Sequence, residues 1–507
     1  MTTTPVRRSD VGLRSERGPV LLAVMICTGL VAIEATIIAT AIPAIVADLG
    51  GFSQFPWLFS VFLLAQAVTV PVYGKLADVV GRRPVMLLGI GLFLIGSVAC
   101  GAAWSMPTLI AARLLQGLGA GAVLPMCMTI LGDLYSVEER AKVQGYVASV
   151  WAMASVVGPT LGGVFSEYAS WRWIFFVNLP IGAVAAVMLM RGFHEQVQRR
   201  PQKVDYTGAA LLIVGCSLLL LALLEGGSAW GWLSPVGISV VAVGVGVLVG
   251  FVLVERRAAE PILPLWVFRR RVLVGGNAVS FAVGAVLIGL TSYVPTYAQG
   301  VLGAGPLAAG FALAALTAGW PITAWLSGRI YVRIGFRDTC LIGTVFVLAG
   351  SVALLPLGVG SALWQVAAAC FVVGLGLGLV ASPSLVAVQS VVGWARRGVV
   401  TGTNMFGRSL GSALGVAVFG AVANATLADR FAAAPARLGD SLPSSADDAA
   451  YVLDPASDAG PAVQAFVQSA LSDATHLVFV GMVISGVLLV GAVLLLPRRT
   501  AALVFDD

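Results

Sequence analysis

Charged side chains are scarce in this chain. Of its 507 residues only 11% are Asp, Glu, Lys or Arg, whereas 59% are hydrophobic. A soluble domain carries about 25% charged residues. This composition excludes a water-soluble globule of this length, and we predict a protein that lies in a membrane.

Histidine and cysteine are also scarce, which excludes two kinds of site. The chain has two histidines, His194 and His476, and six cysteines, and no Cys/His spacing is typical of a zinc site. All six cysteines lie in or at the edge of apolar stretches, so no disulfide framework is expected. A phosphate-binding loop of the form GxxxxGK[ST] is absent, so ATP is not expected to drive the protein directly. We expect neither a metal nor a cofactor.

Long apolar stretches are what the chain has instead. Most of them reach the ~20 residues that cross ~30 Å of hydrocarbon as a helix. They occupy residues 19–45, 56–74, 85–104, 108–131, 143–166, 174–191, 207–224, 235–254, 272–298, 307–328, 339–356, 361–385, 398–423 and 475–497.

Positive charge alternates along these fourteen stretches. Of the 30 Lys and Arg residues, all but five lie in the two tails or in every second gap, as Arg269 to Arg271 do. By the positive-inside rule these gaps and both termini are cytoplasmic, which an even number of spans also requires. The net charge of +6 is then explained by anionic lipid head groups, and nucleic-acid binding is not expected.

Two basic linkers, 192–206 and 255–271, divide the stretches into six, two and six. Two pseudo-symmetric six-helix halves with a substrate path between them are typical of secondary transporters. We therefore predict an all-α polytopic membrane protein. Its parts are an N-terminal six-helix bundle (1–195), an inserted two-helix pair (196–256) and a C-terminal six-helix bundle (257–507) with a long outer loop at 424–474. Within this loop, 455–474 is expected to form a short amphipathic helix on the outer surface.

The gap between the second and third stretches carries the strongest local motif, GKLADVVGRRP at residues 74–84. Gly74 and Gly81 allow a tight reversal with close backbone approach. Asp78 is placed to accept from a helix N-terminus or to pair with nearby arginines. Arg82 and Arg83 anchor the loop on the cytoplasmic side.

This motif resembles the signature loop of the major facilitator superfamily, and further motifs extend the resemblance over essentially the whole chain. RLLQGLGAG at 113–121 is similar to the family's buried arginine motif, and GPTLGG at 158–163 to the motif of its antiporters. IEATII at 33–38 and WRWIFFVNLPIG at 171–182 resemble the fourteen-span drug:proton antiporter branch.

The resemblance implies the major facilitator fold with fourteen transmembrane helices. It also implies a multi-pass protein of the cytoplasmic membrane, not an enzyme, that exports amphipathic drugs or toxic compounds by alternating access. The proton gradient would supply the energy, the source would be bacterial, and the protein would be a monomer.

The chain departs from that branch at three places. Glu34 stands where the branch usually has Asp. The corresponding loop of the second half, GRIYVRIGFR at 328–337, keeps its glycines and positive charge but has no acid. The stretch 307–328 also has no acid, so recognition of dicationic drugs is not implied.

Apart from residues near the ends of the stretches, three charged residues lie within them: Glu34, Arg113 and Arg408. A charge at the bilayer centre costs at least ~2.5–3.5 kcal/mol, so such residues are expected to be functional or paired. At ~1.5 Å per residue, Glu34 lies ~22 Å from the cytoplasmic start of its stretch and Arg113 ~8 Å from the outer start of its own. Both fall in the outer half of the membrane, where they can approach each other.

These positions give Glu34 and Arg113 two interpretations. As the only deep acid, Glu34 is the candidate proton carrier, with Arg113 as its partner in proton coupling. The alternative is a static ion pair. Arg408, near mid-depth, is equally compatible with substrate contact and with bonds to backbone carbonyls.

Glycines and one proline point to gating elements. Gly158 and Gly162 are four residues apart, a spacing that lets helices pack closely in lipid, and Pro159 between them should kink its helix. By resemblance, this face is expected to seal the inner gate.

A substrate pocket is predicted from aromatic and amide residues within the stretches, although each is also compatible with packing. The candidates are Gln66, Trp151, Asn277, Tyr293, Tyr297, Trp320 and Asn404, together with Arg408. Such a pocket suits apolar, weakly cationic or amphipathic molecules better than sugars or strongly anionic metabolites.

Three functions compete at this point. Export of drugs and export of an endogenous lipid, siderophore or self-made antibiotic need the same fold and proton relay. A polytopic membrane enzyme would show acids and histidines clustered in its surface loops, and this sequence has no such cluster. The sequence leaves open the substrate and whether an accessory protein is needed.

Overall fold

The chain folds into a helical membrane protein. The computed structural model describes residues 12–498 except 136, 194–204, 227–229, 232, 259–260, 262, 264, 393–396 and 436–459. Within these residues, fourteen helical segments are long and apolar enough to cross a membrane. The predicted fold class, an all-α polytopic protein with fourteen spans, is confirmed.

The N-terminal half holds the first six spans, and the sixth is made of two consecutive helices. Proline in the first turn starts α1, α2 and α4, where its missing N–H costs no helical hydrogen bond. The helices are α1 (Gly18–Leu49), α2 (Phe55–Val80), α3 (Arg82–Gly101), α4 (Met106–Leu134), α5 (Val137–Tyr168), α6 (Trp173–Phe176) and α7 (Asn178–Gly192).

The remaining eight spans follow in the same way. The inserted pair consists of α8 (Tyr206–Glu225) and α9 (Pro235–Glu255). The C-terminal half holds α10 (Arg271–Gly300), α11 (Pro306–Ile334), α12 (Phe336–Ala353), α13 (Leu363–Ser390), α14 (Arg397–Ala432) and α16 (Pro461–Leu495).

The outer loop is shorter than predicted. Helix α14 continues to Ala432 and α16 begins at Pro461, so only 433–460 lies between them instead of 424–474. The separate amphipathic helix expected at 455–474 is wrong for its described part, because 461–474 is the first part of α16. Its buried residues Val463, Val467 and Ala470 recur at helical spacing and continue the buried stripe of the spanning part. Residues 455–459 lie outside the described part.

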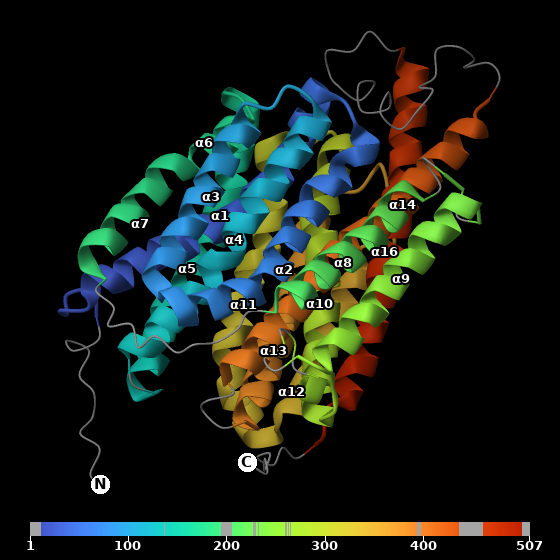
Figure 1. The fold of residues 1–507 in the computed structure, drawn as a ribbon. Coiled ribbons are helices and arrows are strands. Elements are labelled where there is room, and N and C mark those ends of the chain that lie inside the picture. The colour runs from blue at the N-terminus through green and yellow to red at the C-terminus, as the bar shows by residue number, and fades with distance from the viewer. Residues whose placement is uncertain are drawn as a thin grey trace.

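Helix α1 begins and α16 ends on the same side of the bundle, which we call the terminal face; the other side is the distal face (Figure 1). The prediction that the terminal face is cytoplasmic stays a prediction. Toward this face the ribbons of the two halves diverge in Figure 1.

The two halves are joined near the distal face. There Ser60 Oγ donates to the carbonyl of Ala413 at 3.3 Å, and Asn424 Nδ2 donates to that of Ser53 at 2.9 Å. Gln299 Nε2 donates to the carbonyl of Thr40 at 3.2 Å. The described conformation therefore has its halves closed at the distal face.

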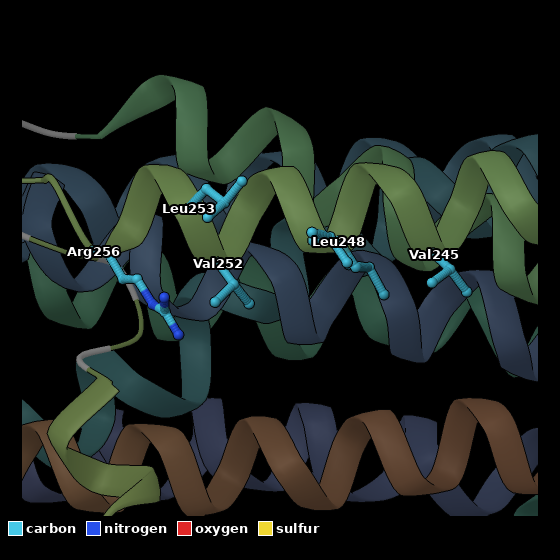
Figure 2. A pocket seen from close by; sticks show the side chains of 6 residues that line it. Val245, Leu248, Val252, Leu253 and Arg256 are labelled. Carbon is cyan, nitrogen blue, oxygen red and sulfur yellow. The ribbon is translucent and has the colours of Figure 1, made fainter.

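The inserted pair packs on the seam between the halves. Apolar residues of α8 form one buried cluster with residues of α2 and α14, which belong to different halves. At the end of α8, Trp57 Nε1 of α2 donates to Glu225 Oε1 at 3.0 Å. Helix α9 packs on α8 and carries a shallow apolar groove of about 450 Å³ that ends at Arg256 (Figure 2).

Candidate functional site

A fully buried ion pair joins α1 to α4. Arg113 Nη1 donates to Glu34 Oε1, and neither residue is more than 1% exposed. The predicted approach of these two residues is confirmed. Their opposite charges meet deep in an apolar bundle, where an unpaired charge would be costly.

A shell of polar groups completes this pair, which we call the Glu34 network. Asn178 Nδ2 donates to Glu34 Oε2 at 2.6 Å, so both carboxylate oxygens accept a hydrogen bond. Arg113 also donates through Nη1 to Gln116 Oε1 at 2.7 Å and through Nε to the carbonyl of Leu58 at 3.1 Å. The guanidinium stacks over the ring of Phe62, 4.0 Å from its centroid.

One more side chain links the shell. Gln116 Nε2 donates to Ser97 Oγ at 2.9 Å, and Ser97 lies 3.4 Å from Asn178 Nδ2. The network therefore draws on α1, α2, α3, α4 and α7, all in the N-terminal half. None of these bonds involves the other half.

The sequence did not single out Asn178, Gln116 or Ser97. Two of them carried a signal, because Asn178 and Gln116 are amides inside the motifs 171–182 and 113–121 and inside apolar stretches. Ser97 carried none, since serine is common in membrane helices.

The 74–84 motif is a junction between two helices and has almost no loop. Helix α2 runs to Val80 and α3 begins at Arg82, with Gly81 alone between them at φ 102°. Gly81 has the predicted role. Gly74 does not, because it lies inside α2 and a Cβ there would meet nothing within 4 Å.

The charged residues of this motif are only partly described. Arg83 donates to the carbonyl of Met190 at the end of α7, which fastens the junction to the same half. Arg82 directly follows Gly81 as the first residue of α3. The side chain of Asp78 lies outside the described part of the chain. In the second half, Gly335 has φ 90° between α11 and α12, so the junction is repeated there.

The glycines of α5 pack as predicted but at a different end. A Cβ on Gly158 or Gly162 would lie within 2.2 Å of a threonine hydroxyl of α1, Thr36 or Thr40. Pro159 presents its carbonyl to Gly310 of α11, where a Cβ would come within 2.7 Å. This face lies toward the distal face of the bundle, and its expected role in sealing the inner gate stays a prediction.

The predicted pocket residues make different contacts in this conformation. Tyr293 is 1% exposed and packs edge-on against Phe55 of the other half, 5.5 Å between centroids, so it belongs to the distal closure. Tyr297 donates to the carbonyl of Gly358 and packs on Phe479, within the C-terminal half. Asn404 bonds Ser280 and Gly276 of α10. The predicted common pocket lining stays a prediction.

Three further candidates are partly exposed, and the fourth, Asn277, lies elsewhere. Trp151 is 37% exposed, and Gln66 and Trp320 are half-buried. Asn277 is buried in a groove between α10, α14 and α16.

Arg408 differs from the other intramembrane charges. It is half-buried, and no hydrogen bond or ion pair of its side chain occurs in the described part of the chain. Ala413 and Gly420 mark the side of α14 that faces α2, and Leu410 and Leu414 the side that faces the groove. At 100° per residue, Arg408 points to neither side but in the direction of Asn404, Gly411 and Gly415, which face α10.

Two six-helix halves that meet at one end, with a buried charge network in one of them, define a transport protein of the alternating-access type. The model of the Major Facilitator Superfamily matches residues 24–416. The chain belongs to the major facilitator superfamily.

Multidrug transporters are among its relatives. The chain is 34% identical over 467 residues to Multidrug transporter protein MdtP of Bacillus subtilis (strain 168), covering 92% of this chain and 86% of the relative. It is 35% identical over 403 residues to Multidrug resistance protein 3 of the same organism, with coverage of 80% and 79%.

Solved structures agree on the fold. A bacterial homologue of the human lysosomal transporter Spinster, in an inward-facing and unoccupied conformation, matches with a TM-score of 0.66 at 17% identity. The match covers 95% of this chain and 98% of that structure.

Proposed function

We propose that this protein exports amphipathic drugs or toxic compounds across a bacterial cytoplasmic membrane, as a monomer driven by proton antiport. The observation that carries the proton coupling is the Glu34 network: one deep carboxyl, held by Arg113 and Asn178, in a transporter related to multidrug exporters. The substrate and the bilayer are its expected partners. An accessory protein is left open.

The network is placed so that it can sense the distal closure. Arg113 Nε is bonded to the carbonyl of Leu58, and Ser60, two residues further along α2, holds the contact to Ala413 of the other half. When the halves part at the distal face, this segment of α2 moves and the bond to Arg113 changes. Glu34 would then take up a proton from the distal side and release it in the conformation described above.

Alternating access follows from the same geometry. If the terminal face is cytoplasmic, the described conformation faces inward, because its halves are closed at the distal face. Substrate would enter from the terminal side and leave when the distal contacts open. Protons would move the other way, as antiport requires.

The test is transport by Glu34→Gln in energised vesicles with an imposed pH gradient. Glutamine keeps the size and the hydrogen bonding but cannot ionise, so gradient-driven export should be abolished, with substrate binding retained. Glu34→Asp should keep part of the activity. Asp48→Asn is the matched control, because Asp48 is on the same helix but pairs with Arg172 at the surface.

Full gradient-driven export by Glu34→Gln would contradict the proposal. Glu34 and Arg113 would then be a static structural ion pair.

A further inference from the structure

A groove of about 750 Å³ runs along α10, α14 and α16 on the outside of the C-terminal half. Its walls are apolar, with Phe281, Leu410, Leu414 and Leu488 among them. Pockets of ~300–1,000 Å³ hold small molecules in proteins. Its lining extends from residue 274 to 285 of α10, which is ~16 Å at 1.5 Å per residue. That length matches one leaflet of a ~30 Å hydrocarbon core.

One buried polar side chain in this groove has no partner. Asn277 is 8% exposed, and neither Nδ2 nor Oδ1 of its amide has a hydrogen-bond partner in the described part of the chain. The two other polar lining residues, Thr403 and Ser485, donate to carbonyls of their own helices. A buried amide without partners costs free energy, so Asn277 is a group that a ligand would satisfy.

The terminal end of the groove is basic. Phe268 and Leu495 line it, and Arg269, Arg270 and Arg498 follow them closely in the chain and are exposed. Asn277 lies six residues into α10, ~9 Å below this basic end. Positive charge, a hydrogen-bond donor and an apolar channel therefore follow one another along the membrane normal.

We propose that this groove binds a phospholipid with an anionic head group. The arginines contact the phosphate, Asn277 Nδ2 donates to an ester carbonyl, and the acyl chain lies along the apolar walls. This order is that of a lipid in the leaflet of the terminal face. The expected substrate path lies between the two halves, whereas α10, α14 and α16, which form this groove, all belong to one half.

The groove on α9 provides the contrast. It is also apolar and also ends in an arginine, Arg256, but it is lined by α9 alone and contains no buried polar group (Figure 2). Bulk lipid is expected to cover it without a preferred species.

The test is native mass spectrometry of the delipidated full-length protein titrated with phosphatidylglycerol or phosphatidylcholine. Wild type should retain phosphatidylglycerol more strongly. Asn277→Leu should weaken this binding about fivefold, the value of one hydrogen bond. Arg269→Gln with Arg270→Gln should reduce the preference over phosphatidylcholine about tenfold. Leu253→Phe, in the α9 groove, is the matched control and should change neither.

A variant that fills the groove gives an independent test in case the other substitutions impair folding. Ser485→Trp should block lipid retention while the protein stays monodisperse. Equal retention of both lipids by wild type, or unchanged binding in Asn277→Leu and Ser485→Trp, would overturn the proposal. Displacement of the lipid by an exported amphiphile would also overturn it, since the groove would then be a substrate site.

Discussion

At the scale of single residues, the Glu34 network gives each oxygen of the carboxylate a hydrogen-bond donor. Its two oxygens accept from Arg113 and Asn178, two residues on different helices. A carboxylate held in this way has little freedom to move without breaking a bond. In the proposed mechanism, the charge state of Glu34 is therefore linked to the relative positions of α1, α4 and α7.

Asn178→Leu tests this coupling. Loss of the hydrogen bond to a buried charge should destabilise the protein by about 2 kcal/mol. The measurement is the melting temperature in detergent. In Glu34→Gln the charge is already gone, so adding Asn178→Leu should cost much less, a non-additivity that a double-mutant cycle reports. Additive effects would show that the two residues are not coupled.

Arg408 supports a different prediction, about substrate choice. An arginine at mid-depth that has no ion pair in the described part of the chain favours substrates that carry an acidic group. Arg408→Gln should leave the melting temperature unchanged and lower export of acidic amphiphiles at least tenfold, with export of neutral ones retained. Arg408→Lys is the control. Equal losses for both substrate groups in a competition assay would refute a role in recognition.

The ion pair could be predicted from sequence because charge and depth are both readable from it. Asn178 and Gln116 were not chosen, since uncharged amides in membrane helices are common and their direction depends on neighbouring helices. The same reason explains Tyr293 and Tyr297. An aromatic residue in a span is expected to be buried, but lateral packing decides whether it lines a cavity, closes the interface as Tyr293 does, or packs within one half as Tyr297 does.

At the scale of helices, glycine positions control how the halves meet. Gly310 of α11 lies against the carbonyl of Pro159 in α5, and both backbones are fixed by their helices. Gly163 repeats this arrangement against Leu307. The close approach of α5 and α11 at the distal face therefore requires small residues.

Gly310→Val should hold the distal closure open. The added atoms would come within 3 Å of backbone, which cannot yield as a side chain can. Transport should fall more than tenfold while a cysteine replacing Ser53 becomes more reactive from the distal side. Gly246→Val on α9, where a Cβ meets nothing within 4 Å, is the matched control. Normal transport by Gly310→Val would show that this contact does not control the cycle.

Helix number was predictable from apolar length, but helix ends were not. The apolar composition indicates where a helix leaves the hydrocarbon region of the membrane. Helices α14 and α16 continue beyond that point because they pack on each other there. The role of Gly81 in the reversal could be predicted, since a residue with positive φ was needed there. The length of the connection, a single residue, could not be predicted.

At the scale of the whole molecule, the orientation in the membrane is a separate prediction. A cysteine replacing Glu16 should react with an impermeant thiol reagent only from the cytoplasm, and one replacing Ala433 only from outside. Both positions are exposed, and the six native cysteines are buried and free, so background labelling should be low. Labelling of both from the same side would contradict the fourteen-span topology.

The division into six, two and six spans was readable from the linkers. The conformation could not be predicted, because the sequence of an alternating-access protein encodes the contacts of both of its closed forms. The position of the inserted pair could not be predicted either, since an apolar helix sequence does not specify which helix it packs against.

That position has a consequence for molecules dissolved in the bilayer. A two-half transporter has two lateral seams, here α2 with α14 and α5 with α11. Helix α8 packs over the seam between α2 and α14. Among the described helices, none packs over the seam between α5 and α11. Hydrophobic compounds diffusing in the membrane therefore meet a molecule with a sealed flank and an unsealed one, so any sideways entry is one-sided despite the pseudo-symmetry of the halves.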